Sequence, residues 1–477
     1  MYFERFYDTP LAQASYLIGC QATGEAVVID ANRDVAQYIH AAEAQKLRIT
    51  QVTETHIHAD YVSGSRELAH LTGATLLLSA EGGPEWQYAF AASAGATLLR
   101  DGDVFSAGNI RFTVMHTPGH TPEHLCFLVT DGAAANEPMG IVSGDFVFVG
   151  DVGRPDLLER AAKFAGTMDA AARTLYASLA KFRRLPDWLQ LWPGHGAGSA
   201  CGKALGAVPS STVGYEKRFN WALAEMIEEE FVASILEGQP EPPRYFAEMK
   251  RINRDGPALL HGLRRPERVP AARAGALLAA GHVLVDTRAA ASFASAHIPG
   301  TLNIPLDKSF STWAGSLLPY DRDIYLIVDD EARAVDEAVR DLAMIGFDRV
   351  AGVLGHDTVP VWAATAAAGQ VAQTSVAELH DALLPRGVAI IDVRNRSEWD
   401  AGRIPGAHHV QLGTLDQRLE EVPRDGVVVV QCQGGGRSAI AASLLAARGY
   451  TNILNLTGGF REWSNAGYPV VRDGASA

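Results

Sequence analysis

An internal repeat in the C-terminal part of the chain constrains the fold more than any other sequence feature. V-D-T-R at Val285–Arg288 and H-I-P-G at His297–Gly300 recur, with the same spacing, as I-D-V-R at Ile391–Arg394 and R-I-P-G at Arg403–Gly406. In each copy an apolar strand, a short loop and a helix ending in G-F or G-Y follow. Strand–loop–helix units repeated at fixed spacing predict two α/β domains with parallel sheets.

Residues 1–260 alternate strand-like and helix-like segments, and their polar motifs come where strands end. T-H-I-H-A-D-Y at Thr55–Tyr61 comes at the end of one expected strand, and H-T-P-G-H-T begins where another ends at His116. S-G-D lies in a third expected strand, and a fourth runs into P-G-H-G. Loops after strands are where a rigid scaffold presents functional groups. The segments expected as strands are Ser15–Gly19, Glu25–Asp30, Ile49–Thr55, Ala74–Ser79, Ile110–His116, His124–Thr130, Gly140–Val149 and Leu189–Trp192. Val35–Leu47 and Ala161–Arg184 are expected as helices.

A polar, proline-containing stretch at Glu237–Arg244, continuing to Pro257, predicts a linker. A chain of 477 residues exceeds what one hydrophobic core usually supports. We therefore expect three domains, at residues 1–260, 265–369 and 374–472. A homo-oligomer is a separate expectation.

Composition excludes some classes of protein. With 47% hydrophobic and 20% charged residues the chain is globular, and its net charge of −14 disfavours nucleic acid as a partner. No apolar run reaches the ~18–20 residues of a membrane span, and the N-terminus lacks the apolar segment of a signal peptide. Four widely spaced cysteines, Cys20, Cys126, Cys201 and Cys432, predict free thiols in a reducing cytoplasm.

Imidazoles and carboxylates in the post-strand loops form a metal-ligand pattern. A single histidine after a strand is usually structural, but four motifs in a fixed order are more specific. The candidate residues are His56, His58, Asp60, His116, His120, Asp145 and His195.

In order and context, these motifs resemble the metallo-β-lactamase superfamily. The resemblance implies an αββα sandwich with a metal at one edge of its two sheets. The superfamily pattern normally places histidine where Tyr61 stands. Because a phenol is a poor ligand for a second zinc ion, this departure favours a single metal.

Within the superfamily the chain resembles the persulfide dioxygenases. That resemblance implies one Fe(II) per chain, held by His56, His120 and Asp145, since two imidazoles and one carboxylate suit non-haem iron that must bind O₂. His58, Asp60 and His195 would lie behind these ligands and fix their orientation. For His58 and Asp60, hydrogen bonds that merely order the loop remain an alternative.

Five further residues are candidates for substrate contact, each with a structural alternative. Cys201 could meet the substrate's terminal sulfur, although a small buried residue is the favoured reading. Tyr215, Lys217 and Arg218 could hold the carboxylates of a thiol cofactor or form a solvated helix face. Arg154 could do the same or form a salt bridge.

C-Q-G-G-G-R at Cys432–Arg437 places one thiol at the start of a glycine-rich turn. Such a turn aims backbone N–H groups at one point, and a following helix N-terminus also stabilises a thiolate. Arg437 could pair with an anionic sulfur acceptor. The residues expected to cradle the anion are Gln433, Gly434, Gly435 and Gly436.

Thr374–Arg472 resembles rhodanese domains, which implies that Cys432 carries a persulfide. The first copy keeps the framework and loses the nucleophile. Aligning the G-F and G-Y helix ends sets Asp329 opposite Cys432, within an acidic D-D-E-A-R loop. Because aspartate cannot carry sulfur, this domain is expected to be inactive and to serve as a structural or interface element.

Together the two sites resemble a persulfide dioxygenase–rhodanese fusion. The implied function is oxidation of a low-molecular-weight thiol persulfide, such as glutathione persulfide, by O₂ to sulfite. Sulfur transfer at Cys432 would then give thiosulfate, in sulfide or persulfide detoxification. Two alternatives remain open: a glyoxalase II-type zinc thioester hydrolase fused to a sulfurtransferase, and a non-catalytic sulfur sensor.

Overall fold

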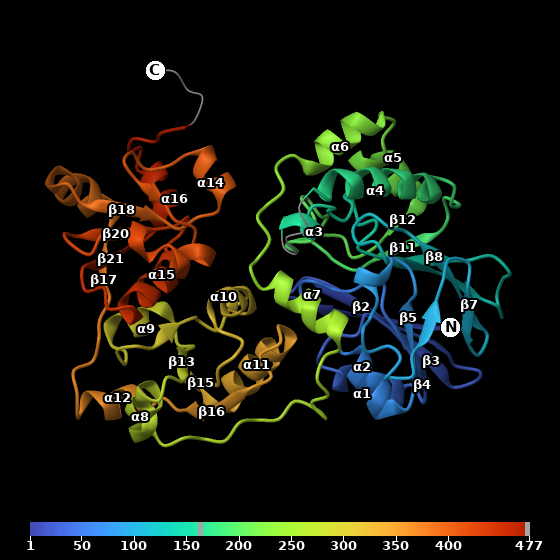
Figure 1. Ribbon diagram of the computed structural model, residues 1–477, viewed down its shortest axis with the longest axis horizontal. Coiled ribbons are helices and arrows are strands. Elements are labelled where there is room, and N and C mark those ends of the chain that lie inside the picture. The colour runs from blue at the N-terminus through green and yellow to red at the C-terminus, as the bar shows by residue number, and fades with distance from the viewer. Residues whose placement is uncertain (161–165, 473–477) are drawn as a thin grey trace. The chain divides into compact units, whose positions relative to one another are not determined.

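The computed structural model describes residues 1–160 and 166–472. The chain divides into two compact units, Met1–Leu263 with Ala343–Gly346, and Arg264–Leu342 with Phe347–Ala477 (Figure 1). Each unit is described by itself below.

Two six-stranded sheets build the first unit, in the orders β1-β2-β3-β4-β5-β6 and β12-β11-β10-β9-β8-β7. Alternating polarity explains why these segments form strands: in I-R-F-T-V-M-H of β8, Ile110, Phe112 and Val114 are buried and Arg111 is exposed. The strands are β1 (Tyr2–Asp8), β2 (Gln13–Cys20), β3 (Glu25–Ile29), β4 (Arg48–Thr53), β5 (Thr75–Ser79), β6 (Thr97–Leu99), β7 (Val104–Ala107), β8 (Ile110–His116), β9 (Leu125–Asp131), β10 (Gly140–Gly144), β11 (Gln190–Pro193) and β12 (Ser211–Thr212).

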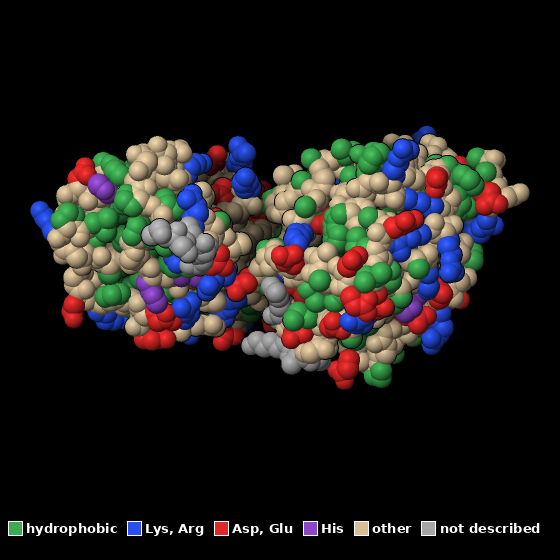
Figure 2. All heavy atoms as spheres, turned by 90° about the horizontal axis from the view of Figure 1, so that it is seen from above, with side chains coloured by type: hydrophobic (Ala, Val, Ile, Leu, Met, Phe, Trp, Pro, Cys, Tyr) green, Lys and Arg blue, Asp and Glu red, His purple; other side chains and the backbone are tan. Residues whose placement is uncertain are grey.

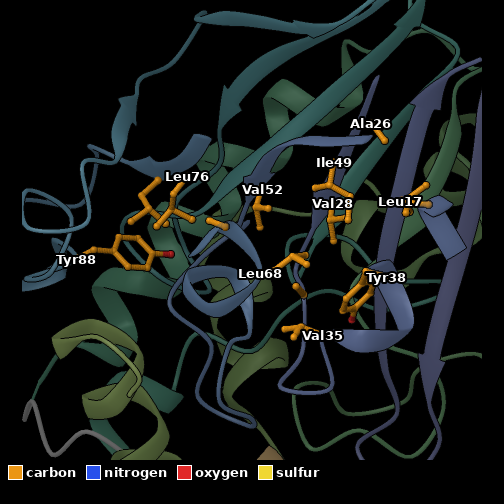
Figure 3. Close-up of a cluster of buried hydrophobic side chains, with 14 of the residues drawn as sticks. Leu17, Ala26, Val28, Val35, Tyr38, Ile49, Val52, Leu68, Leu76 and Tyr88 are labelled. Atoms are coloured by element: carbon orange, nitrogen blue, oxygen red, sulfur yellow. The ribbon is translucent and has the colours of Figure 1, made fainter. Parts of the chain in front are cut away.

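Helices cover the outer faces of both sheets. They are α1 (Ala36–Ala44), α2 (Ser65–Thr72), α3 (Leu157–Arg160), α4 (Met168–Arg183), α5 (Val213–Phe219), α6 (Glu228–Leu236) and α7 (Phe246–Asp255). Figure 3 shows the core between the first sheet and its helices, where Tyr38 of α1 and Leu68 of α2 gather with Val28 and Val52. A second core lies between the sheets, and a third lies under α4 and α6. These layers are the predicted αββα sandwich.

The expected strands are present, with boundaries shifted by a few residues. The predicted helix at 161–184 is observed as α4, and residues 161–165 lie outside the described residues. The predicted linker is wrong in its second half, because α7 occupies it. Phe246, Met249 and Asn253 recur at helical spacing and are buried on one face of that helix. Its charged residues mask this pattern in the sequence.

The second unit contains two parallel sheets, which confirms the reading of the repeat. The first has the order β14-β13-β15-β16 and the second β17-β21-β20-β18-β19. The first repeat comprises α8 (Ala274–Ala279), β13 (Val283–Asp286), α9 (Ala290–Ser295), β14 (Leu302–Asn303), α10 (Phe310–Leu317), β15 (Ile324–Ile327), α11 (Glu331–Met344), β16 (Val350–Leu354) and α12 (Thr358–Ala363). The second comprises β17 (Ala372–Thr374), α13 (Val376–Glu378), β18 (Ala389–Asp392), α14 (Arg396–Ala401), β19 (His408–His409), β20 (Val428–Gln431), α15 (Gly436–Ala447), β21 (Ile453–Leu456) and α16 (Gly459–Asn465).

All four cysteines are buried free thiols, as expected. Within residues 1–160 and 166–472, none of the helices combines the length and the apolar character that a membrane span requires. Figure 2 shows Lys and Arg side chains mixed with Asp and Glu side chains over the face that it displays. Charges of the two signs are therefore interspersed on that face.

Candidate metal centre and sulfur-transfer loop

The carboxyl ends of the inner strands bring the predicted ligands together. His56 follows β4, His120 lies between β8 and β9, and Asp145 follows β10. One ligand atom from each of these three buried residues lies within 4.8 Å of the other two. The first sheet supplies one member of this group and the second sheet supplies the other two.

Hydrogen bonds to Nδ1 turn the imidazoles of His56 and His120 toward Asp145. The Thr55 hydroxyl donates to Asp30 (3.0 Å), so its oxygen accepts from Nδ1 of His56 (2.9 Å). Nδ1 of His120 donates to the carbonyl of Arg154 (3.0 Å). The Nε2 atoms then face Oδ2 of Asp145, at 3.9 Å from His56 and 3.5 Å from His120. Fixing the tautomer in this way prepares an imidazole to bind a metal.

Burial and charge keep these imidazoles neutral. Burial lowers the pKa of His56 well below its ordinary value, and the neighbouring His58 lowers it further. Burial also lowers the pKa of His120, although the Asp145 charge opposes that shift. A neutral imidazole keeps the lone pair that a metal needs.

The surroundings of Asp145 fit a cation. Within the described part of the chain, both carboxylate oxygens are buried without a hydrogen-bond donor. Such atoms are costly unless a charge satisfies them. Two glycines leave the space open, because a Cβ at Gly194 would lie 2.6 Å from Oδ1 and one at Gly153 would lie 1.8 Å from the Asp145 carbonyl oxygen. The donor set therefore fits a metal ion held by His56, His120 and Asp145.

His58 and Tyr61 turn away from this group, toward Asp30. Nε2 of His58 lies 3.1 Å from Oδ1 of Asp30, and the Tyr61 hydroxyl donates to the Asp30 carbonyl (3.3 Å). Burial alone would lower the pKa of His58, but the Asp30 charge outweighs it and raises the pKa to about 9. Burial raises the pKa of Tyr61 well above 10, so its phenol stays neutral. Both side chains brace the loop in this geometry.

Asp60, His195 and Cys201 form a second buried donor group beside the first. Nδ1 of His195 donates to the Ala12 carbonyl (3.0 Å), and its Nε2 lies 3.2 Å from Oδ2 of Asp60 and 3.6 Å from Oδ1 of Asp145. Burial raises the pKa of Cys201 well above 9, and the charges of Asp60 and Asp145 raise it further. Cys201 therefore lies among the acidic groups of the centre as a protonated thiol.

Sequence reasoning missed three residues that position this centre. Asp30 anchors Thr55 and His58, and it adopts a left-handed backbone conformation with φ of 58°, which is uncommon outside glycine. Its place after a buried strand was the available signal. His124 accepts a hydrogen bond from the Asp145 amide (3.1 Å), and Asn253 of α7 bonds the Thr55–Tyr61 loop; neither lies in a motif.

Other candidate residues already have partners. The buried Arg154 guanidinium forms a bidentate pair with Asp156 (2.7 Å for both bonds) and donates to two backbone carbonyls. Arg154 therefore contacts His120 through its own backbone carbonyl and not through its side chain. His116 hydrogen-bonds the Pro122 carbonyl at 2.8 Å. On α5, the Tyr215 ring packs at a tilt against Phe219, Lys217 pairs with Asp187 and Arg218 lies over the Phe219 ring. These α5 contacts are those of a solvated helix face.

The Cys432 loop in the second unit runs from β20 into the N-terminus of α15. The Cys432 sulfur accepts hydrogen bonds from the Gly435 amide (3.1 Å) and the Ser438 hydroxyl (3.5 Å). Gly435 has φ of 98°, which permits the turn. A Cβ at Gly459 would lie 2.2 Å from the Cys432 carbonyl oxygen, so that neighbour must also be glycine. Amides and the helix N-terminus together stabilise a sulfur anion here.

Arg437 is held rather than free. Its two terminal nitrogens donate to the two carboxylate oxygens of Glu398, each at 2.6 Å. Glu398 in turn accepts from the Asn395 amide (3.1 Å), within the capping box of α14. Arg437 thus ties the Cys432 loop to α14, and Glu398 offsets much of its charge.

In the first repeat, strand register corrects the predicted alignment by one residue. Asp286 pairs with Ile327 as Asp392 pairs with Gln431, so Val328 is equivalent to Cys432. Asp329 lies one residue further on and is exposed. The error arose because the connection from strand to helix end is one residue shorter in the second repeat. Like aspartate, valine cannot carry sulfur.

Comparison with known families agrees with this division of the chain. The metallo-beta-lactamase superfamily matches residues 8–195, and the rhodanese-like domain matches residues 271–356 and 375–466. The superfamily match spans the metal centre from β1 to His195. The second rhodanese-like match contains Cys432.

Individual proteins match one part of the chain or most of it. A sulfurtransferase from Allochromatium vinosum is 37% identical over 84 residues, covering 18% of this chain and 78% of that protein. A probable metallo-hydrolase from Burkholderia pseudomallei is 30% identical over 260 residues, covering 49% of this chain and 84% of that protein. The crystal structure of a metallo-beta-lactamase from Staphylococcus aureus is 43% identical, with a TM-score of 0.66, covering 74% of this chain and 99% of that one. By these matches the chain belongs to the metallo-β-lactamase superfamily and continues into two rhodanese-like domains.

Proposed function

We propose that the first unit is a mononuclear iron dioxygenase that oxidises a low-molecular-weight thiol persulfide to sulfite. The observation that carries the proposal is the donor set of two neutral imidazoles and one carboxylate, from which Tyr61 is turned away. Fusion to a sulfur-transfer domain supports a sulfur-containing substrate. Bound at His56, His120 and Asp145, Fe(II) would supply the O₂ chemistry.

The overall reaction balances as RSSH + O₂ + H₂O → RSH + SO₃²⁻ + 2H⁺. His195 and Asp60 provide a proton for the departing thiolate. Nδ1 of His195 donates to the Ala12 carbonyl, and Nε2 of His195 faces the Asp60 carboxylate. A proton on Nε2 therefore interacts favourably with that carboxylate. Nε2 of His195, the atom that would carry the proton, lies 3.6 Å from Oδ1 of Asp145.

Sulfur transfer at Cys432 consumes the sulfite. The Cys432 thiolate takes the outer sulfur of a second persulfide, and sulfite attacks that sulfur to leave as thiosulfate. The transfer balances as RSSH + SO₃²⁻ → RSH + S₂O₃²⁻. The chain thereby removes two persulfides for each O₂, which is a detoxifying reaction.

A zinc thioester hydrolase is the second candidate. It is favoured by the adjacent Asp60, His195 and Cys201 group, which could hold a second ion, and by the hydrolase name of the Burkholderia relative. Zinc-activated water attacks an acyl carbon in that chemistry. The two candidates differ in metal number and in oxygen consumption.

Metal analysis and oxygen uptake of anaerobically purified protein test the proposal. We expect one iron per chain and oxygen uptake with glutathione persulfide. Asp145→Ala should lose both, while sulfur transfer from thiosulfate to cyanide at Cys432 continues. The matched control is Asp169→Ala, which removes an exposed carboxylate from the same unit.

Two results would reject the proposal. Two zinc ions per chain, with zinc-dependent hydrolysis of a glutathione thioester and no oxygen uptake, would establish the hydrolase. A bound metal without turnover of either substrate would indicate a sensor.

A further inference from the structure

A cavity of about 790 Å³ lies over Cys432, and both repeats line it. Cys432, Arg437 and Ile440 come from the second repeat, and Asp307, Ser309 and Trp313 come from the first. The repeat that has no nucleophile therefore forms one wall of the cavity in which the nucleophile of the other repeat lies.

Buried contacts fix this wall relative to Cys432. Helix α15, which begins at the end of the Cys432 loop, packs against β14 and α9 of the first repeat (Figure 1). Across that contact the backbone N–H of Asn303 donates to the hydroxyl of Ser443 (3.1 Å), and both residues are buried. The segment carrying Asp307, Ser309 and Trp313 starts just after Asn303, so its position is set by the helix that follows the nucleophile.

The cavity is far larger than an inorganic sulfur anion requires. Sites for small organic molecules occupy about 300–1,000 Å³, and this volume lies within that range. Sulfite or thiosulfate would leave most of it to water. The size indicates a ligand with an organic body.

Charge in the cavity also favours an organic ligand over a dianion. Arg437 and Asp307 are the charged residues that line it, and Glu398 neutralises Arg437. Asp307 accepts hydrogen bonds from the amide (2.8 Å) and hydroxyl (2.7 Å) of Ser309 through Oδ1. Its negative charge repels sulfite and thiosulfate and attracts an ammonium group.

Trp313 offers an apolar surface in the same wall. The side chain is half-buried, and within the described residues it has neither a hydrogen bond to its indole nor an aromatic neighbour. An aromatic ring with an unused N–H at a cavity wall suits an amphipathic ligand, which can pack on the ring and accept from the N–H.

We propose that Trp313 and Asp307 bind the organic part of the thiol persulfide that loads Cys432. The first rhodanese-like repeat then selects the sulfur donor for the second. This inference rests on the proposed function and adds that the donor is an organic thiol bearing an ammonium group.

The transfer step is a displacement at sulfur. The Cys432 thiolate attacks the outer sulfur of R–S–S–H and forms the new S–S bond. The donor's S–S bond breaks, its electron pair leaves on R–S⁻, and R–S⁻ takes the persulfide proton. Throughout, the group R stays against Trp313.

Donor selectivity of the full-length chain tests the inference. Loading of Cys432 is measured with glutathione persulfide, whose glutathione part carries an ammonium group, and with thiosulfate, which has no organic part. Trp313→Ala should raise the half-saturating concentration of glutathione persulfide about tenfold, and Trp313→Phe should raise it less. The value for thiosulfate should stay within about twofold for both variants.

Two further variants sharpen the test. Asp307→Asn should raise the half-saturating concentration for glutathione persulfide and lower the one for thiosulfate, because it removes attraction for the first and repulsion for the second. The control Trp362→Phe changes an indole of the same repeat whose N–H bonds the Ala367 carbonyl and which does not line the cavity. This control should leave the half-saturating concentrations of both donors unchanged.

Equal changes in the half-saturating concentrations of both donors would show that Trp313 and Asp307 have a structural role only. Unchanged half-saturating concentrations for both donors would show that these two residues do not contact the donor. If Trp313→Ala does not fold, Trp313→Phe and Asp307→Asn decide the question. Wild-type loading by glutathione persulfide tests the proposed function separately, because only the variants address selectivity.

Discussion

Asn253 is the residue whose replacement best tests how the metal loop is held. Its buried side chain donates to the carbonyls of His58 (2.8 Å) and Tyr61 (2.7 Å) and accepts from the Ser63 amide (2.9 Å). Asn253→Ala removes all three hydrogen bonds and leaves three buried backbone groups unpaired. At about 1 kcal/mol for each bond, the free energy of opening the loop should fall by about 3 kcal/mol.

Hydrogen exchange measures this effect locally. Since about 1.4 kcal/mol corresponds to a tenfold change, the amides of Ser63 and Gly64 should exchange about 100-fold faster in Asn253→Ala. A peptide from β9 should keep its wild-type rate. Metal content should fall as well, because His56 lies on the loosened loop.

The matched control is Asn136→Ala, which removes an exposed asparagine from the same unit. Exchange within about threefold of the wild-type rate at Ser63 and Gly64 would refute the reasoning. Equal acceleration throughout the first unit would also refute it, because it would indicate global unfolding rather than local opening.

Two further predictions concern the sulfur-transfer loop. Cys432→Ala should keep oxygen uptake and release sulfite in place of thiosulfate, as product analysis under limiting oxygen will show; thiosulfate at the wild-type level, above a protein-free control, would exclude Cys432 from the pathway. Although partial burial of Glu398 raises its pKa, hydrogen bonding to Arg437 lowers it below the ordinary value. The pair should therefore stabilise the domain above about pH 4.3, with the contribution lost as the pH falls through the depressed pKa. Unfolding midpoints of Glu398→Gln and wild type should converge at acidic pH, and a constant difference down to pH 3 would contradict this.

Sequence patterns could single out His56, His120 and Asp145, which the structure brings together, because their motifs come where strands end. His56 follows β4 and Asp145 follows β10, so these polar side chains come just after strands whose last residues are buried. The internal repeat likewise predicted both parallel sheets, since V-D-T-R and I-D-V-R mark the ends of β13 and β18, which pair with equivalent strands in the two sheets.

Residues that act from a distance could not be predicted in the same way. Asn253 reaches the loop from a helix about 190 residues further along the chain, within charged sequence that resembled a linker. Cys201 was a candidate for the site from the sequence, but its place beside Asp60 and His195 depends on the path of the long connection after β11. The cavity wall carrying Trp313 depends on how the repeats pack, and no motif within either repeat encodes that.

The contact between Ser443 and Asn303 has a consequence for folding. Both residues are buried and α15 packs across the contact within one compact unit, so we expect the two repeats to unfold together. The copy with Val328 at the position of Cys432 would then contribute to the stability of the other copy. Destabilising substitutions in the core of the first repeat, away from the cavity, should then abolish sulfur transfer at Cys432 by unfolding both repeats.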